Sequence, residues 1–488
     1  MNLAAILVDK TGIKEKSLQT FFDITYKKIK NLTPEIYLLS QKTELQVPDD
    51  VKIISFQTSN ELLNFLSTSL RQKTILILNA YSPLTDIETT KKSLDEHVRF
   101  AFDYTFPENI PAGILPEIFE ADIAKFILNT VPENLPLFKN SIKELFEKDI
   151  SSYDCNIAIS PSRLVLYRVN FIPDSYNNFL ITKNIIDKYG TDYNHLKLEE
   201  YIKKEPDLIL GRPTYYEIEL TTERESGLSF ISTRLNREGE MPLKLFEETV
   251  KQISQFSFNP SVSLGLYGEP FLHSDINSII EIVKGYQEIS FLFESRCLFN
   301  HIEGISKALQ TPNVKIIFDI SASTPEMFSN QKKPLNPMLP FEGLSTIEEK
   351  INSLPNKEKI YIQYTRTTEN EKELVKFYEK WRAFGERLII KKPDIFGGIL
   401  ENYRVVDLSP IKRFACLHLK HDLSIFFDGT VPLCRQDYNA EFKAGNIKTD
   451  GLESCWEKLK EIYKKQWNNI FDRPSVCKKC DEWWIFNL

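Results

Sequence analysis

The stretch Tyr-Tyr-Glu-Ile-Glu-Leu-Thr-Thr at residues 215–222 begins the part of the sequence that decides the fold. It alternates apolar and polar residues, as a half-buried strand does, and it leads into a polar loop at residues 223–229. A helical pattern runs from Pro242 to Phe256, and Ser-Val-Ser-Leu-Gly-Leu-Tyr-Gly-Glu-Pro at residues 261–270 is a second strand that stops at a Gly-Glu-Pro turn. This order predicts a βαβ unit whose parallel strands end at one edge, where chemistry is expected.

The alternation of strands and helices continues from residue 213 to about residue 405. With the first two strands, the predicted strands make six βα units, a partial barrel in an α/β fold. The further strands are predicted at residues 289–294, 314–320, 360–364 and 388–391. Helices are predicted between them at residues 275–283, 299–308, 345–353 and 371–384.

The order Glu-Leu-Thr-Thr, loop, helix, strand, Gly-Glu-Pro resembles the start of a radical S-adenosylmethionine (radical SAM) barrel. In that family the first loop carries a C-x3-C-x2-C motif for a 4Fe-4S cluster, and a Gly-Gly-Glu-Pro motif contacts the methionyl end of the cofactor. The resemblance places the second motif at Gly268, Glu269 and Pro270. These three residues are therefore the cofactor-binding positions that the resemblance implies.

The cluster motif itself is missing from this chain. The resemblance places its three ligand positions at Glu225, Ser229 and Ser232, and no cysteine occurs between Cys155 and Cys297. One carboxylate and two hydroxyls are a poor set of ligands for a soft metal site. The sequence therefore predicts a degenerate radical SAM scaffold without the family's radical-generating reaction. It designates no catalytic residue and argues against S-adenosylmethionine as a cofactor.

The cysteines of the tail are the strongest chemical pattern in the sequence. They read Cys416-x12-Gly-x4-Cys434 and then Cys477-x2-Cys480, and an Asp-Gly turn between the first two predicts a hairpin. A hairpin can bring the first two thiols together, and a C-x2-C turn presents two more to one metal. Four convergent thiolates indicate either Zn or an iron–sulfur cluster.

This tail resembles the SPASM or "twitch" domain that follows many radical SAM barrels. The chain offers one four-cysteine site, as in the shorter twitch form, and the resemblance implies a 4Fe-4S cluster there, with Zn as the alternative. Cys455 is predicted on an amphipathic helix outside the site. His418 and His421, close to Cys416, are expected beside the ligands or at the surface.

Residues 1–150 alternate strands with helices and resemble the glycosyltransferase-A type core of sugar-nucleotide transferases (nucleotidyltransferase-like). In that family an acid after a central strand holds a divalent metal. The corresponding position here is Asn79 or Ser82, with Asp86 a little beyond, and the glycine-rich nucleotide loop is missing. We therefore expect a retained, non-catalytic α/β domain. Asp86 is expected to start a helix, and His97 with Asp103 to have surface or capping roles.

The domain boundaries expected from the sequence are 1–150 for the nucleotidyltransferase-like domain, 151–212 for a connecting region, 213–405 for the barrel and 406–488 for the SPASM-like tail. Around the first boundary, residues 133–147 are predicted to be mainly helical and residues 154–169 to form a hairpin or paired strands. Two helices are predicted within residues 177–204. This domain order identifies the chain as a member of the spiro-SPASM family by resemblance.

Composition narrows the expected partners and location. A net charge of −7 with mixed signs leaves no basic surface for nucleic acid. No apolar run reaches the ~20 residues of a membrane span, and the N-terminus shows no signal peptide. Seven unevenly spaced cysteines favour a reducing cytoplasm.

Three functions remain open from the sequence. The first is an iron–sulfur protein with a binding or electron-transfer role. The second is a radical SAM/SPASM-type enzyme that modifies a peptide or protein together with a partner. The third is an interaction protein whose tail is held by Zn, and a nucleotidyltransferase activity is disfavoured by Asn79.

Overall fold

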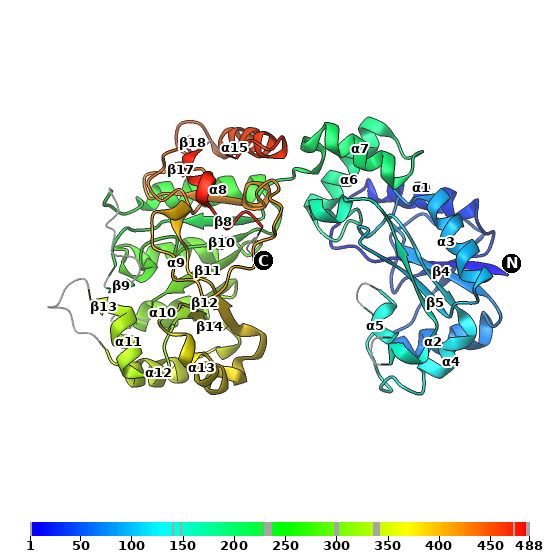
Figure 1. Cartoon of the computed structure of the whole chain (residues 1–488), viewed down its shortest axis with the longest axis horizontal. Coiled ribbons are helices and arrows are strands. Elements are labelled where there is room, and N and C mark those ends of the chain that lie inside the picture. Colours follow the sequence, from blue (N-terminus) through cyan, green and yellow to red (C-terminus); the bar gives the residue numbers. More distant parts are fainter. Residues whose placement is uncertain are drawn as a thin grey trace. The chain divides into compact units, whose positions relative to one another are not determined.

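The computed structural model describes residues 2–138, 141–146, 149–224, 226–228, 237–296, 302–334, 342–471 and 474–484. The chain divides into two units, Met1–Gly211 and Arg212–Leu488, and each unit is built on its own sheet (Figure 1).

The sheet of the first unit has the strand order β3-β2-β1-β4-β6-β5-β7. Its strands are β1 (Leu3–Val8), β2 (Ile36–Leu39), β3 (Val51–Ile54), β4 (Thr74–Asn79), β5 (Tyr104–Glu108), β6 (Glu117–Glu120) and β7 (Cys155–Ile159). Its helices are α1 (Leu18–Lys30), α2 (Ser59–Ser69), α3 (Ile87–Arg99), α4 (Ala124–Ile127), α5 (Lys143–Phe146), α6 (Tyr176–Tyr189) and α7 (His195–Lys204).

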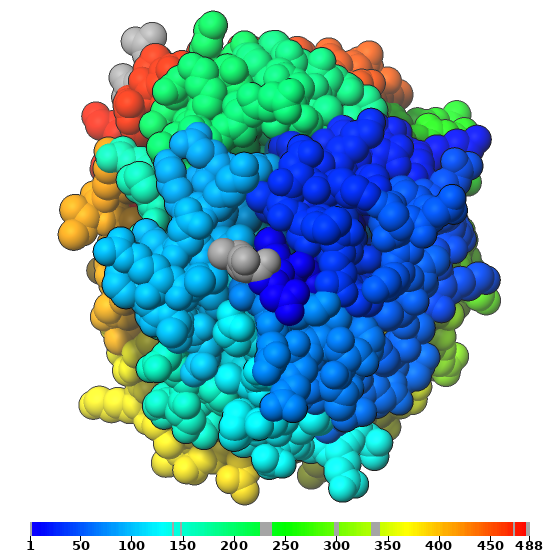
Figure 2. Space-filling view, turned by 90° about the vertical axis from the view of Figure 1, so that its right-hand side faces the viewer, coloured from blue at the N-terminus to red at the C-terminus, as the bar shows by residue number. Residues whose placement is uncertain are grey.

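The central strands of this sheet are apolar on both faces because helices cover both sides. In β1, Ala4 and Ile6 belong to one hydrophobic cluster, whereas Ala5 and Leu7 belong to the other. Helix α2 packs in the first cluster and α1 in the second. On the second side α6 joins α1, where the rings of Phe21 and Phe179 lie 5.4 Å apart. Figure 2 shows the green residues of the segment that contains α6 and α7 next to dark blue residues from near the N-terminus.

Two predictions for the first unit need correction, and one strand was not predicted. Within residues 133–146, the described residues are mostly irregular and only the short α5 is helical, so the helix predicted over residues 133–147 is wrong. The hairpin predicted over residues 154–169 is also wrong, because β7 pairs with β5 in parallel and a 3-10 turn (Leu164–Tyr167) follows it. Strand β6, which pairs antiparallel with β4 and β5, was missed.

The main sheet of the second unit has the order β15-β14-β12-β11-β10-β8-β16, and every pair in it is parallel. Its strands are β8 (Tyr215–Ile218), β10 (Ser261–Ser263), β11 (Ser290–Ser295), β12 (Val314–Asp319), β14 (Ile360–Thr365), β15 (Leu388–Lys391) and β16 (Asp422–Ile425). Its helices are α8 (Leu243–Phe256), α9 (Ile276–Lys284), α10 (Ile302–Gln310), α11 (Pro325–Gln331), α12 (Leu344–Ser353) and α13 (Leu374–Trp381).

This sheet confirms the predicted partial barrel. Strands β8, β10, β11, β12 and β14 follow one another through the unit in Figure 1, and α8 connects β8 to the parallel β10 as the βαβ prediction requires. A short antiparallel pair, β9 (Ser226–Leu228) with β13 (Lys332–Pro334), lies outside the main sheet.

The tail extends the barrel, which the sequence analysis did not foresee. Its first strand, β16, pairs in parallel with β8 and so becomes part of the barrel sheet. The predicted hairpin turn forms, with the Phe426 N–H donating to Thr430 O at 2.8 Å. The return strand β17 (Thr430–Pro432) pairs instead with β18 (Lys443–Asn446) in a separate sheet. The tail also contains α14 (His418–His421), α15 (Leu452–Trp467) and the 3-10 helix η11 (Ser475–Lys479).

Among the described residues, no helix is long and apolar enough to cross a membrane.

Candidate metal centre

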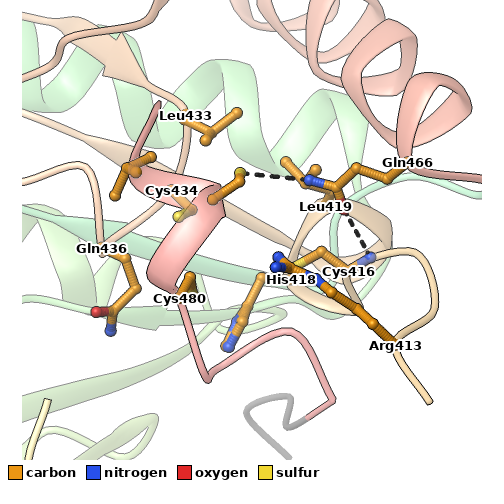
Figure 3. Close-up of a pocket in the computed structure, with 11 residues that line it drawn as sticks. Arg413, Cys416, His418, Leu419, Leu433, Cys434, Gln436, Gln466 and Cys480 are labelled. Atoms are coloured by element: carbon orange, nitrogen blue, oxygen red, sulfur yellow. Dashed lines mark hydrogen bonds between the residues drawn. The ribbon is translucent and has the colours of Figure 1, made fainter. Parts of the chain in front are cut away.

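Four cysteines from separate parts of the tail line one cavity, which we call the four-cysteine cavity. Cys416 precedes α14, Cys434 follows β17, and Cys477 and Cys480 lie in and just after η11. Figure 3 shows side chains from these segments around a common space. The cavity is lined by Arg413, Cys416, His418, Leu419, Leu433, Cys434, Gln436, Gln466, Val476, Cys477 and Cys480. Cys455 lies on α15, as predicted, and is not one of these lining residues.

Gln466 on α15 joins two of the cysteine segments. Its side-chain Oε1 accepts the backbone N–H of Cys416 at 2.9 Å, and its Nε2 donates to the Sγ of Cys477 at 3.3 Å (Figure 3). Gln466 is 1% exposed, so these bonds are shielded from water. This role of Gln466 was not predicted from the sequence, although a glutamine on the apolar face of an amphipathic helix indicates a buried polar partner.

The other three thiols also receive N–H donors from the backbone. The N–H groups of His418 and Leu419 point to the sulfur of Cys416, and the N–H of Gln436 points to that of Cys434. The N–H of Glu482 donates to Cys480 Sγ at 3.4 Å. Hydrogen bonds of this kind stabilise thiolates, which are the form of cysteine that binds metal.

The four thiols lie within electrostatic range of one another. Burial, and after it the neighbouring thiols of Cys480 and Cys477, raises the pKa of Cys416 well above its usual value. Burial, and after it the thiols of the other three cysteines, also raises the pKa of Cys434 well above its usual value. Burial raises the pKa of Cys477 to about 11 and that of Cys480 to about 12. Metal binding at this cavity would therefore release protons from the thiols.

Two basic side chains, Arg413 and His418, also line the cavity. The Arg413 guanidinium lies over the rings of Phe471 and Trp483, at 4.7 and 5.9 Å from their centroids, and its Nε and Nη2 are buried without a hydrogen-bond partner in the described structure. His418 is 3% exposed and bonds to Asp422 through Nδ1. Its Nε2 has no hydrogen-bond partner among the described residues.

In the described part of the chain, no three His, Cys, Asp or Glu side chains are arranged closely enough to hold a single metal ion.

The Gly-Glu-Pro residues lie at the carboxyl end of β10. A Cβ on Gly268 would lie 1.8 Å from Thr221 O, so this position needs glycine for the close approach of two backbone segments. Glu269 is 2% exposed and its Oε2 accepts the backbone N–H of Arg296 at 2.9 Å. Pro270 begins a short 3-10 helix, Pro270–Leu272. Cofactor binding by these three residues stays a prediction.

The positions aligned with the missing cluster motif, Glu225, Ser229 and Ser232, lie outside the described residues, as does Cys297.

A second cavity lies at the carboxyl ends of the barrel strands, and we call it the strand-end cavity. Its walls hold charged residues from several strands together with residues of the tail. They are Arg224, Gly265, Leu266, Tyr267, Glu294, Arg296, Asp319, Thr365, Lys391, Asp394, Phe396, Arg435 and Tyr438. The period-two alternation of β11 buries Phe291 and Phe293 on one side of the strand and places Glu294 on the other, and Arg296 follows just after the strand ends.

In the first unit, Asn79, one of the two positions that correspond to the related family's metal-holding acid, is engaged in local structure. Asn79 Oδ1 accepts the N–H of Tyr81 at 2.9 Å, and its Nδ2 donates to Lys10 O. The loop after β1 is covered by residues 173–174, because the Gly12 N–H donates to Pro173 O at 3.1 Å.

Asp86 caps α3 as predicted, accepting the N–H of Thr89 at 2.9 Å. It also bonds to His195 Nδ1 at 2.7 Å, and both side chains are buried. The expected surface or capping role of His97 is wrong. This residue is fully buried, with Nδ1 2.8 Å from Thr105 Oγ1 and Nε2 3.2 Å from Glu120.

Residues 416–481 match the family model of the SPASM domain, described as an iron-sulfur cluster-binding domain. A protein of Treponema pallidum (strain Nichols), named only as an uncharacterized protein, is 27% identical over 364 residues. The match spans 71% of this chain and 98% of that relative.

Three solved structures show a similar arrangement over part of the chain. BtrN in complex with AdoMet and 2-DOIA is 16% identical, with a TM-score of 0.41 over 55% of this chain and 93% of BtrN. Streptococcus suis SuiB bound to the precursor peptide SuiA is 13% identical, with a TM-score of 0.39 over 70% and 83%. A cytidylyltransferase of Leptospira borgpetersenii is 15% identical, with a TM-score of 0.36 over 43% and 97%.

These TM-scores are low, so nothing about activity is transferred from the three structures. The segment that matches the family model begins at Cys416 and ends one residue after Cys480. The four cysteines that line one cavity therefore all belong to the matched segment. Residues 416–481 of this chain form a SPASM domain.

Proposed function

We propose that this protein binds one 4Fe-4S cluster through Cys416, Cys434, Cys477 and Cys480 and acts in electron transfer or cluster-dependent binding. The observation that carries this proposal is the convergence of four thiols, all buried or partly buried, from three chain segments on one cavity. The match of the same residues to an iron-sulfur cluster-binding domain supports it independently.

The surroundings of the thiols fit such a cluster. Each of the four sulfurs has at least one N–H donor, from the backbone or from Gln466. A cluster held by four thiolates carries net negative charge, and the guanidinium of Arg413 would offset part of it. The aromatic rings of Phe471 and Trp483 hold this cation in place.

Four protein ligands also indicate what the cluster would do. They occupy all four irons, so none is left open for S-adenosylmethionine. When bound, such a cluster supplies one-electron chemistry. The residues around it would hold it, set its reduction potential and exclude water, and the degenerate barrel would carry no radical-generating step of its own.

The test compares the anaerobic absorbance spectrum of the full chain with those of Cys477→Ser and Cys155→Ser. We expect the broad absorption of an iron–sulfur cluster in the wild-type protein and in Cys155→Ser, because Cys155 lies in β7 of the first unit and does not line the cavity. Cys477→Ser should lose most of the absorption. A colourless wild-type protein containing zinc, or a spectrum that is unchanged in Cys477→Ser, would overturn the proposal.

A further inference from the structure

The four-cysteine cavity contains two N–H donors for which the described residues supply no acceptor. Arg413 lines the cavity, and its Nε and Nη2 atoms are buried without a hydrogen-bond partner in the described structure. An arginine stays protonated on every guanidinium nitrogen, so both atoms donate and neither can accept. A buried donor without an acceptor is destabilising and rare in folded proteins. These two atoms therefore point to a bound group that brings acceptors into the cavity.

Aromatic rings hold the guanidinium of Arg413 beside the thiols. It lies over the ring of Phe471, 4.7 Å from the centroid, and over that of Trp483 at 5.9 Å. Trp483 is buried, and its ring meets that of Phe414 edge-on at 4.7 Å. The charge of Arg413 opposes the rise that burial causes in the pKa of Cys477. Because stacking uses only the flat faces of a guanidinium, the N–H groups in its plane stay available to an acceptor.

The cysteine sulfurs do not serve as these acceptors. Each of the four sulfurs already has an N–H donor from the backbone or from Gln466, and none of them is hydrogen-bonded to the buried nitrogens of Arg413. A single Zn²⁺ bound by the four thiolates would add no acceptor of its own. An iron–sulfur cluster brings inorganic sulfides, which accept hydrogen bonds. Within the described ranges, no three His, Cys, Asp or Glu side chains are placed to hold a single ion, which also favours the larger group.

We propose that Arg413 donates hydrogen bonds from Nε and Nη2 to the sulfides of the cluster, and thereby raises its reduction potential and favours it over a single zinc ion. This inference rests on the cluster proposed above. The reduced cluster is the more negative form, so donors on a cation stabilise it more than the oxidised form. With zinc in the cavity, both N–H groups of Arg413 would stay buried without an acceptor, and this cost disfavours zinc.

The experiment is a spectroelectrochemical titration of the anaerobically purified full chain beside Arg413→Met, which removes both donors but keeps a flexible, unbranched side chain. At a fixed potential, the ratio of reduced to oxidised cluster should fall by about tenfold or more in this variant. Tenfold corresponds to a potential lower by about 59 mV for a one-electron couple. Arg382→Met, which removes an exposed arginine of the same unit, should leave the potential unchanged. Equal potentials of Arg413→Met and the wild-type protein would overturn the proposal.

Metal content gives a second readout. After expression in medium with equal iron and zinc, the zinc-to-iron ratio of Arg413→Met should exceed that of the wild-type protein by about tenfold, and an unchanged ratio would refute the selection of the cluster. If Arg413→Met does not fold, Arg413→Lys replaces it; it keeps the charge but not the fork of donors, so an unchanged potential there refutes the paired bonds. A wild-type chain without any cluster would instead overturn the proposed function itself.

Discussion

The strand-end cavity and the four-cysteine cavity share one short segment but balance their charges differently. Arg435 lines the first cavity, while its neighbours Cys434 and Gln436 line the second. In the strand-end cavity, most charged groups have partners within this chain. In the four-cysteine cavity, four ionisable thiols face a single arginine. The strand-end cavity balances its charges within the chain, whereas the unpaired thiols of the four-cysteine cavity fit the proposal that a metal cluster binds there.

The largest expected effect tests the strand-end cavity, where most charged groups are paired within the chain. Arg435 lies 2.9 Å from Glu217 and 3.0 Å from Asp394, and these acids hold its pKa well above the usual value despite burial. Arg435→Met leaves both carboxylates buried without their cation. We expect the free energy of unfolding to fall by about 3–5 kcal/mol.

Urea unfolding followed by tryptophan fluorescence measures this change, since the five tryptophans of the sequence all lie in the second unit. Arg382→Met is the control and should stay within about 0.5 kcal/mol of the wild-type protein. A loss below about 1 kcal/mol for Arg435→Met would show that the ion pairs of Arg435 with Glu217 and Asp394 do not stabilise the fold.

A smaller effect extends the comparison to the first unit. Hydrogen bonds from His195 and Thr89 outweigh burial and lower the pKa of Asp86 from 3.8 to about 2. A carboxyl group with a lowered pKa stabilises the fold above its unfolded pKa, and this stability is lost as the pH falls through the folded value. Asp86 should thus contribute about 2 kcal/mol at neutral pH and lose it between about pH 4 and pH 2.

Acid unfolding followed by far-UV circular dichroism measures this contribution. Asp86→Asn should unfold at a higher pH than the wild-type protein and be less stable at neutral pH. Asp95→Asn, an exposed aspartate on the same helix, is the matched control. Identical acid transitions for Asp86→Asn and the wild-type protein would contradict the prediction.

The smallest expected effect sharpens the account of the four-cysteine cavity. Gln466→Met removes the N–H donor to Cys477 Sγ but keeps a side chain of similar size. Loss of a donor destabilises the more negative, reduced cluster. At about 1 kcal/mol for one hydrogen bond, the reduction potential should fall by roughly 40 mV.

Spectroelectrochemical titration measures this shift. The exposed Gln287→Met should leave the potential unchanged. A potential that does not move in Gln466→Met would show that this side chain does not contact the cluster.

The barrel could be predicted from the sequence because its strands and helices follow one another with clear periodicity. The meeting of the four cysteines at one cavity could be predicted because a hairpin and a C-x2-C turn each bring two cysteines together locally, while their binding of a metal stays a prediction. Pairing between distant strands could not, so the addition of β16 to β8 and of β7 to β5 was missed. The buried roles of His97 and Gln466 depend on partners far away in the sequence, Thr105 and Glu120 for one and the cysteine segments for the other.

The central claim is tested most directly by the iron, acid-labile sulfide and zinc content of the anaerobically purified full chain. A single cluster at Cys416, Cys434, Cys477 and Cys480 predicts about four iron and about four sulfide per chain, with no zinc. About one zinc without sulfide would contradict it and make the tail a zinc-held structure. About eight iron would show a second cluster and contradict the interpretation of Glu225, Ser229 and Ser232.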